Sequence, residues 1–238
     1  MLEKLQLDKI LFLDIETVPQ EYDFKKLDEK TKDLFEAKTR FMQNTEKSFE
    51  TLYGERGGIY AEFGKIICIS VGFIHETRTG KEIRLKSFYH DDEETVLNQF
   101  KSLLDEKLGR DFILCGHNAK EFDFPYICRR MLVNGIKIPK LLDIMGKKPW
   151  EVSLLDTMEL WKFGDYKAYT SLALLCHIFN IPTPKDDISG ADVAMVYYEQ
   201  NDLERIKVYC EKDVIALIQL FLRMRGDALV PVAEIKMS

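Results

Sequence analysis

The sequence predicts an α/β fold, in which helices flank a central mixed sheet of five strands. Two observations carry this prediction. The first is the order of the segments: three strand-like apolar runs come in succession, and strands then alternate with helical patterns. The second is size, because a chain of 238 residues can bury a substantial core without disulfides or metal clusters. This order favours a sheet with both antiparallel and parallel pairs.

The expected strands are short apolar or alternating runs that turn-forming residues interrupt. They cover residues 9–18, 65–74, 82–89, 111–116 and 152–156. The expected helices have apolar residues at spacings of three and four. They cover residues 91–108, 124–133, 171–179, 191–199 and 203–225. We expect one domain over residues 1–238, with the charge-rich residues 20–62 as a partly helical insertion between the first two strands.

Composition narrows the class of protein. The chain has no apolar run of membrane-spanning length and no signal-peptide pattern, so we expect a cytoplasmic protein without a membrane partner. Its five cysteines are an odd number without a C-x-x-C pair, which favours buried free thiols over disulfides or a zinc site. The net charge of −6 argues against tight nonspecific binding of nucleic acid. It does not exclude a nuclease, because bound cations reverse the local charge.

The first expected strand carries two carboxylates. Positions i and i+2 of a strand point to the same face, so Asp14 and Glu16 project together from an apolar run. Two like charges in a poorly solvated place raise each other's pKa or require a cation. Magnesium and manganese prefer such hard oxygen ligands. Taken alone, the pair also fits a strand end whose acids reach water.

A second candidate lies where the fourth strand gives way to a helix. This segment runs from Cys115 to Pro125 and contains Asp123. Ligands of open α/β sheets gather at the carboxyl ends of the strands. Asp123 stands two residues before Pro125, a residue that suits the first turn of a helix. The alternative is that Asp123 only caps that helix.

The last expected helix holds a third candidate, Asp213. One face of this helix carries Ile206, Cys210, Asp213, Leu217 and Leu220. An acid on an otherwise apolar face is costly unless it is paired or binds a metal ion. Tyr209 precedes Asp213 by four residues, so its phenol neighbours the carboxylate and can hold a water. The alternative is an ion pair of Asp213 with Arg205, Lys207 or Lys212.

Together and in this order, the three segments resemble the exonuclease motifs of the DEDD (DnaQ-like) 3′–5′ exonucleases, which have a ribonuclease H-like fold. The motif residues are Asp14, Glu16 and Thr17 (D-x-E, then Thr), Asn118, Phe122 and Asp123 (N-x-x-x-F-D), and Tyr209 and Asp213 (Y-x-x-x-D). The tyrosine subtype (DEDDy) fits, because the histidine subtype would have His at Val208. The resemblance spans residues 9 to about 225. It is strongest to the proofreading exonuclease domain of family B DNA polymerases and to stand-alone bacterial exonucleases related to it.

This resemblance implies a metal-dependent 3′–5′ exonuclease. Such an enzyme removes nucleoside 5′-monophosphates from the 3′ end of nucleic acid, here expected to be single-stranded DNA, with RNA left open. The implied cofactors are two divalent cations, Mg²⁺ or Mn²⁺, with Asp14 bridging both ions and Tyr209 helping Glu16 to orient the attacking water. The implied ligands are Asp14, Glu16, Asp123 and Asp213.

Substrate contacts follow from the same resemblance. The family positions near the terminal nucleotides are Thr17, Asn118 and Phe122, and a looser match adds Lys185. Phe122 fits a core residue equally well, and Lys185 fits a solvated lysine. A basic cluster follows the second motif and can track a phosphate backbone or form a solvated face. It consists of Arg129, Arg130, Lys137, Lys140, Lys147 and Lys148.

Two other functions remain open from the sequence. One is a catalytically inactive ribonuclease H-like module that binds nucleic acid or a protein partner. The other is a metal-dependent phosphohydrolase of free nucleotides. The complete set of four carboxylates favours an active nuclease over the inactive module. The sequence leaves the oligomeric state undetermined.

Overall fold

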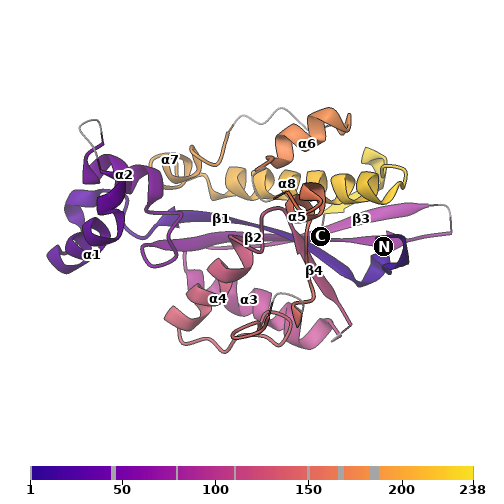
Figure 1. Cartoon of the computed structure of the whole chain (residues 1–238), viewed down its shortest axis with the longest axis horizontal. Helices are drawn as coiled ribbons and strands as arrows, with labels where there is room; N and C mark the ends of the chain where they lie inside the picture. Colours follow the sequence, from indigo (N-terminus) through magenta and orange to yellow (C-terminus); the bar gives the residue numbers. More distant parts are fainter. Residues whose placement is uncertain are drawn as a thin grey trace.

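The strands of this computed structural model form one mixed sheet of six strands, in the order β5–β4–β1–β2–β3–β6 (Figure 1). The structure describes residues 2–43, 47–78, 80–109, 111–148, 151–165, 169–182 and 188–237. The strands are β1 (Ile10–Pro19), β2 (Gly64–Glu76), β3 (Lys81–Tyr89), β4 (Ile113–Gly116), β5 (Leu154–Asp156) and β6 (Ile235–Met237). The predicted α/β class and mixed sheet are confirmed.

Strand β1 has an antiparallel neighbour on one side and a parallel neighbour on the other. This strand pairs antiparallel with β2, which pairs antiparallel with β3. On its other side β1 pairs parallel with β4, which pairs parallel with β5. The expected number of strands was one too low, because β6 adds a parallel partner at the free edge of β3. Three residues, of which Lys236 and Met237 are exposed, are too short to show the alternation that marks a strand in sequence.

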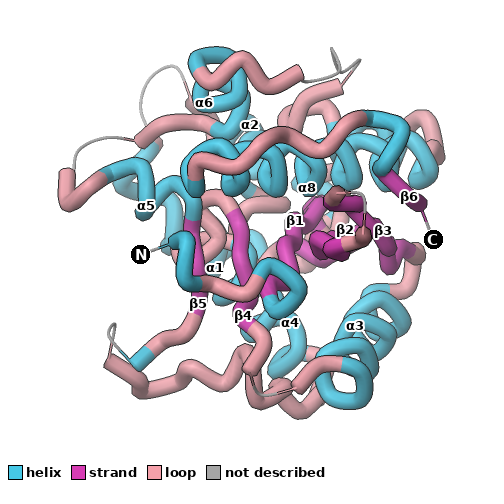
Figure 2. Tube along the Cα trace, turned by 90° about the vertical axis from the view of Figure 1, so that its right-hand side faces the viewer, coloured by secondary structure: helices cyan, strands magenta, loops and turns pink. Residues whose placement is uncertain are grey.

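Helices cover both faces of the sheet (Figures 1 and 2). One face packs against α3 (Glu93–Ser102) and α4 (Asp123–Val133), and the other against the long α8 (Leu203–Arg225). The helices α5 (Thr157–Lys162), α6 (Leu172–Ile178) and α7 (Val193–Tyr198) lie on the α8 side. Strand β1 separates the two cores by alternation, because Leu11, Leu13 and Ile15 face α3 and α4, while Ile10 and Phe12 face α8.

Local sequence signals define the ends of the helices that matter for the site. The Asp202 side chain accepts a hydrogen bond from the Arg205 amide and so caps the start of α8. Gly226 ends α8 in the left-handed conformation, at φ 88°. The expected helix over 91–108 is shorter, because α3 ends at Ser102 and a π-helix continues over Leu103–Lys107. Helix α5, which has six residues, was not predicted.

The segment between β1 and β2 contains α1 (Glu29–Thr39) and α2 (Phe49–Arg56). The expectation of helical turns at the periphery is confirmed, and the two helices lie beyond one end of the sheet (Figure 1). Few apolar positions were expected to pack there, yet Phe35 and Leu52 are fully buried with Tyr53 and Phe63 in a small aromatic core. The ring centroid of Phe35 lies 5.0 Å from that of Tyr53, 5.2 Å from that of Phe63 and 6.0 Å from that of Phe24, which joins the same core.

The prediction of buried free thiols is confirmed for four of the five cysteines. All five are free thiols, and Cys68, Cys115, Cys176 and Cys210 are buried, while Cys128 is half-buried. In the part of the chain that the structure describes, no helix has both the length and the apolar character needed to cross a membrane.

Candidate active site

Two of the predicted carboxylates stand on the face of β1 that α8 covers. Ile10 and Phe12 lie beneath α8, and Asp14 and Glu16 continue the same alternation along the strand. Glu16 is only 8% exposed, and Asp14 is half-buried. The pairing of β1 with β2 changes register directly after Glu16. The two acids therefore project together against a helix and not into open water.

Helix α8 brings the third predicted segment to this pair. The Cys210 thiol lies 3.4 Å from an Asp14 carboxylate oxygen. One turn further on, the negative charge of Asp213 raises the pKa of both Asp14 and Glu16. The Tyr209 hydroxyl donates a hydrogen bond to Asp213. Lys207, one alternative partner for Asp213, instead lies 2.6 Å from Glu204.

Asp123 enters from the opposite side of β1. It is the first residue of α4, which a loop over residues 117–122 connects to β4, the parallel neighbour of β1, and it is 5% exposed. Its carboxylate accepts hydrogen bonds from its own amide and from the backbone amide of Ile15. The capping interpretation therefore covers only part of its role, because Asp123 also joins α4 to the strand that carries Asp14. Its charge raises the pKa of Asp14.

Electrostatic interactions couple Asp14 and Glu16 to Asp123 and Asp213, and Asp14, Glu16 and Asp123 lie in poorly hydrated surroundings. Burial raises the pKa of Asp14 and of Glu16 well above the ordinary range, and repulsion by the neighbouring carboxylates raises it further. Burial also raises the pKa of Asp123 to about 7. Burial and the charge of Asp213 raise the pKa of Tyr209, which keeps its hydroxyl protonated. Such a cluster is stabilised by a divalent cation.

The carboxylates of Asp14 and Glu16 fit a hard divalent ion, and the Cys210 thiol beside them is a softer donor. One ligand atom each from Asp14, Glu16 and Cys210 lies within 4.8 Å of the other two. Carboxylate oxygens at this spacing are the ligands that Mg²⁺ and Mn²⁺ prefer. Cys210 was expected only as a buried thiol on the apolar stripe of α8. The spacing of that stripe placed it beside Asp213 but did not show that its sulfur faces Asp14.

The predicted substrate residues differ in their surroundings. The Thr17 hydroxyl donates to the Gly58 carbonyl at 2.8 Å, and the Tyr126 hydroxyl donates to the same oxygen at 2.8 Å. Phe122 is half-buried against Tyr126, with 5.3 Å between ring centroids, which favours its interpretation as a core residue. Lys185 lies outside the described residues.

Asn118 has two unusual features. Its backbone is left-handed, at φ 61°, a conformation that asparagine tolerates better than most residues. Its side-chain oxygen is buried and has no hydrogen-bond partner among the described residues. A buried acceptor without a partner carries a desolvation cost, so this oxygen is available to a ligand that offers a donor.

The basic cluster after the second motif is not a single surface. Arg130 is 4% exposed and forms an ion pair with Glu93 at 2.7 Å, so its assignment to a phosphate-tracking or solvated face was wrong. Sequence alone could not separate Arg130 from the exposed Arg129, because the distinction depends on α3 packing against α4. The other members are exposed: Arg129, Lys137, Lys140, Lys147 and Lys148.

Asp156 organises the second-motif segment and was not predicted. It ends β5, is 3% exposed, and accepts hydrogen bonds from the backbone amides of Asn118 at 2.9 Å and Lys120 at 3.0 Å. The same carboxylate caps α5 through the amides of Met158 and Glu159. An acid that ends a short apolar strand and precedes a helix was the available signal, but the unexpected α5 concealed it.

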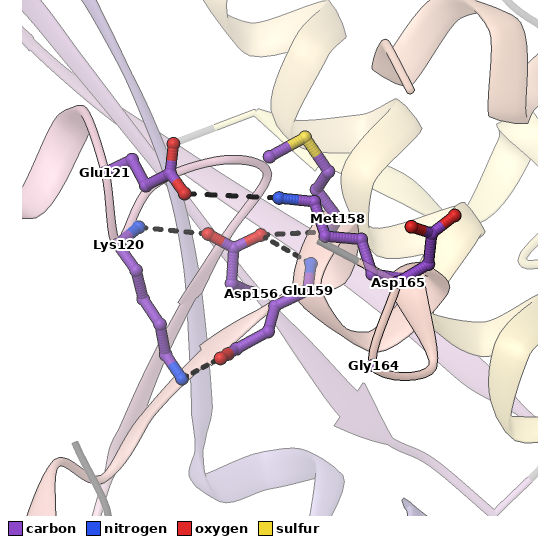
Figure 3. A pocket seen from close by; sticks show the side chains of 8 residues that line it. Lys120, Glu121, Asp156, Met158, Glu159, Gly164 and Asp165 are labelled. Carbon is purple, nitrogen blue, oxygen red and sulfur yellow. Dashed lines mark hydrogen bonds and ion pairs between the residues drawn. The ribbon is translucent and has the colours of Figure 1, made fainter. Parts of the chain in front are cut away.

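A pocket of about 310 Å³ lies over Asp156, between the second-motif segment and α5 (Figure 3). Lys120 and Glu121 line one side, and Glu159 and Asp165 the other. Lys120 and Glu159 form an ion pair across it. None of the four predicted metal ligands lines this pocket. Asp156 connects this pocket to the predicted metal ligands, because its negative charge also raises the pKa of Asp123.

The fold and site together define an α/β protein of the ribonuclease H-like class with a carboxylate centre on its central strand. The chain belongs to a family of predicted 3′–5′ exonucleases related to the exonuclease domain of PolB, whose family model matches residues 59–228. That range includes Asp123, Tyr209 and Asp213 and begins after β1. The predicted relationship to family B polymerase exonucleases is thereby confirmed.

Solved structures show the same fold. The structure of the family B DNA polymerase from the hyperthermophilic archaeon Pyrobaculum calidifontis matches 94% of this chain, with a TM-score of 0.53 and 16% sequence identity. The chain spans about a quarter of that polymerase, of which 27% is covered. The comparison with curated proteins finds no match.

Proposed function

We propose that this protein is a metal-dependent 3′–5′ exonuclease of the tyrosine subtype, with single-stranded DNA as its substrate. One observation carries the proposal: acids from β1, the start of α4 and α8 form one electrostatically coupled centre. Sequence segments this far apart have no structural need to bring four carboxylates together. The family membership independently supports a nuclease.

Each residue of the centre has a separate role in this proposal. Asp14, Glu16, Asp123 and Asp213 would hold two divalent ions, Mg²⁺ or Mn²⁺. When bound, these ions lower the pKa of water and offset the charge that develops on the phosphate. Tyr209, hydrogen-bonded to Asp213, orients the attacking water together with Glu16. Attack on the terminal phosphodiester breaks its bond to the 3′ oxygen of the preceding nucleotide and releases a nucleoside 5′-monophosphate.

Asn118 would bind the terminal nucleotide. Its buried oxygen accepts a hydrogen bond from a sugar hydroxyl or a base amine. Thr17 and Phe122 would border the same nucleotide, with the Thr17 side chain held by Gly58. These contacts would hold the 3′ end beside Asp14 and Glu16, as cleavage of the terminal phosphodiester requires.

The proposal is tested with purified protein, Mn²⁺, and single-stranded DNA or RNA labelled at the 5′ or the 3′ end. We expect the 5′-labelled DNA to shorten stepwise and the 3′ label to leave as a mononucleotide. Asp14→Ala should abolish the reaction because it removes the carboxylate shared by the centre. Asp8→Ala is the matched control, since Asp8 is exposed and lies two residues before the same strand.

Two outcomes would contradict the proposal. Hydrolysis of free nucleotides without shortening of the oligonucleotides would indicate a nucleotide phosphohydrolase. Binding of oligonucleotides without cleavage, under every divalent ion tried, would indicate an inactive binding module.

A further inference from the structure

A cysteine stands within the carboxylate centre. Cys210 is fully buried, and its sulfur lies 3.4 Å from both the Asp14 carboxylate and the Asp14 carbonyl oxygen. Together with Glu16, the three side chains place their ligand atoms within 4.8 Å of one another. A tetrahedral zinc site with one sulfur and two oxygens needs these atoms about 3.6 Å apart. The 3.4 Å between the Cys210 sulfur and the Asp14 carboxylate oxygen already meets this requirement.

The composition of this trio differs from that of a purely carboxylate centre. Carboxylates suit magnesium and manganese, while a thiolate favours softer ions such as zinc. Three protein ligands with a fourth position left for water is the arrangement of catalytic and inhibitory zinc sites. The trio therefore has a chemical preference that the four carboxylates alone would not have.

We propose that Cys210 makes the Asp14–Glu16 position a mixed thiolate–carboxylate site that binds zinc-type divalent ions in competition with Mg²⁺ and Mn²⁺. This inference rests on the proposed function, because it concerns the same metal position. Coordination replaces the S–H bond of Cys210 with a sulfur–metal bond and releases one proton to the solvent, with no change of oxidation state. A zinc ion bound to the thiolate would exchange slowly, so zinc should inhibit the nuclease.

Cobalt(II) is a suitable probe, because a cobalt–thiolate bond absorbs in the near ultraviolet, whereas cobalt carboxylates lack that charge-transfer band. We expect titration of the metal-free protein with Co²⁺ to produce the band and zinc to remove it by competition. Cys210→Ser should abolish the band and weaken zinc binding by at least about tenfold. Mg²⁺ binding should change far less, since it does not depend on sulfur.

Two controls identify the sulfur. Cys115→Ser changes a buried free thiol on β4, and it should keep the band. Cys68→Ser changes the thiol that neighbours Cys210 from β2, and it should also keep the band. A band that is missing from the wild-type protein, survives in Cys210→Ser, or disappears only in Cys68→Ser overturns the inference.

A measurement on the wild-type protein covers the case in which Cys210→Ser does not fold. The X-ray absorption spectrum of the zinc-loaded protein should show one sulfur at about 2.3 Å from the metal. A shell of oxygen and nitrogen alone contradicts the inference. These readouts are independent of nuclease activity: an inactive protein with the band refutes only the nuclease, and an active nuclease without the band refutes only the thiolate site.

Discussion

Tyr209 is the residue whose proposed role depends on a single atom. Its ring is half-buried beside α7, and its hydroxyl contacts Asp213. Tyr209→Phe keeps the ring and removes the hydroxyl that would orient the water. We expect turnover to fall roughly a hundredfold, the lower end of what a positioned acid–base group contributes. Single-turnover cleavage of labelled single-stranded DNA measures this, and calorimetric Mn²⁺ binding should stay nearly intact.

The matched control for this change is Tyr89→Phe, because Tyr89 is an exposed tyrosine near α8. Its turnover should equal that of the wild-type protein. Unchanged turnover in Tyr209→Phe would refute the assigned role.

Single residues of the site differ in how far sequence predicts them. Asp14 and Glu16 are predictable because strand alternation fixes their common direction, and Asp213 because helical spacing places it on the buried stripe. The left-handed backbone of Asn118 and the contact of Cys210 with Asp14 are not predictable in this way. Both depend on how a loop and a helix meet β1, which local periodicity does not encode.

At the scale of elements, Asp156 connects β5, α5 and the second-motif segment. Asp156→Asn keeps the shape but replaces one acceptor oxygen with an amide that faces the backbone N–H groups of Asn118 or Lys120. We expect a loss of about 1–3 kcal/mol in unfolding free energy, the cost of leaving buried donors without an acceptor. The Mn²⁺ concentration for half-maximal cleavage should also rise, because Asp156 holds the backbone of Asn118 and Lys120, and the proposed metal ligand Asp123 follows on the same segment.

Asp165→Asn serves as the control for this prediction, since Asp165 is exposed at the rim of the same pocket. Urea denaturation and a Mn²⁺ titration of cleavage give the two readouts. Equal values for the Asp156 and Asp165 variants would show that the hydrogen bonds of Asp156 do not position the segment.

A buried ion pair connects α3 to α4. Arg130 contacts Glu93 through two nitrogens and donates to the Ala61 carbonyl, while Glu93 also accepts from the Ile66 amide. Arg130→Ala leaves the Glu93 carboxylate buried without its cation. We expect a loss of about 3–5 kcal/mol in unfolding free energy by urea denaturation.

Arg129→Ala changes the exposed neighbour of Arg130 and should stay within about 0.5 kcal/mol of the wild-type value. If both variants unfold at the same urea concentration, the ion pair does not hold the two helices. Nuclease assays on Arg129→Ala then report phosphate contacts separately from stability.

At the scale of the whole molecule, the carboxylate centre couples stability to pH. The pKa of Asp123 rises from 3.8 to about 7 on folding, so the folded protein binds more protons than the unfolded chain between these values. The stability of the metal-free protein therefore falls as pH rises through this window. Asp14 and Glu16, whose pKa values are also raised by burial and by the neighbouring carboxylates, add to this fall.

We expect the melting temperature of the metal-free protein to decrease from about pH 4 to about pH 7, the window between the ordinary and the raised pKa of Asp123. Saturating Mn²⁺ should reverse this trend, because it binds the deprotonated carboxylates. Asp123→Asn should flatten the metal-free dependence, and the surface variant Asp8→Asn should not. Differential scanning fluorimetry measures all four cases, and a melting temperature that rises with pH without metal would contradict the assignment.

Most of the architecture was predictable because its main elements have clean periodicity. The apolar run of β2 and the long stripe of α8 needed no tertiary information. The aromatic core around α1 and α2 was not predictable, because Phe24, Tyr53 and Phe63 come from separate turns and helices that only the folded chain brings together. Whether residues 20–62 form an insertion into an otherwise minimal domain stays a prediction.

The separation of the site residues along the chain has a consequence for synthesis. Asp14 and Cys210 touch although their positions are 196 residues apart in the sequence. A growing chain can pair β1 with β2 early, but α8 emerges from the ribosome much later than β1. Under the proposed function, the nascent polypeptide cannot degrade nucleic acid before α8 has been translated. The order of translation itself delays the appearance of a nuclease beside the ribosome until that helix is available.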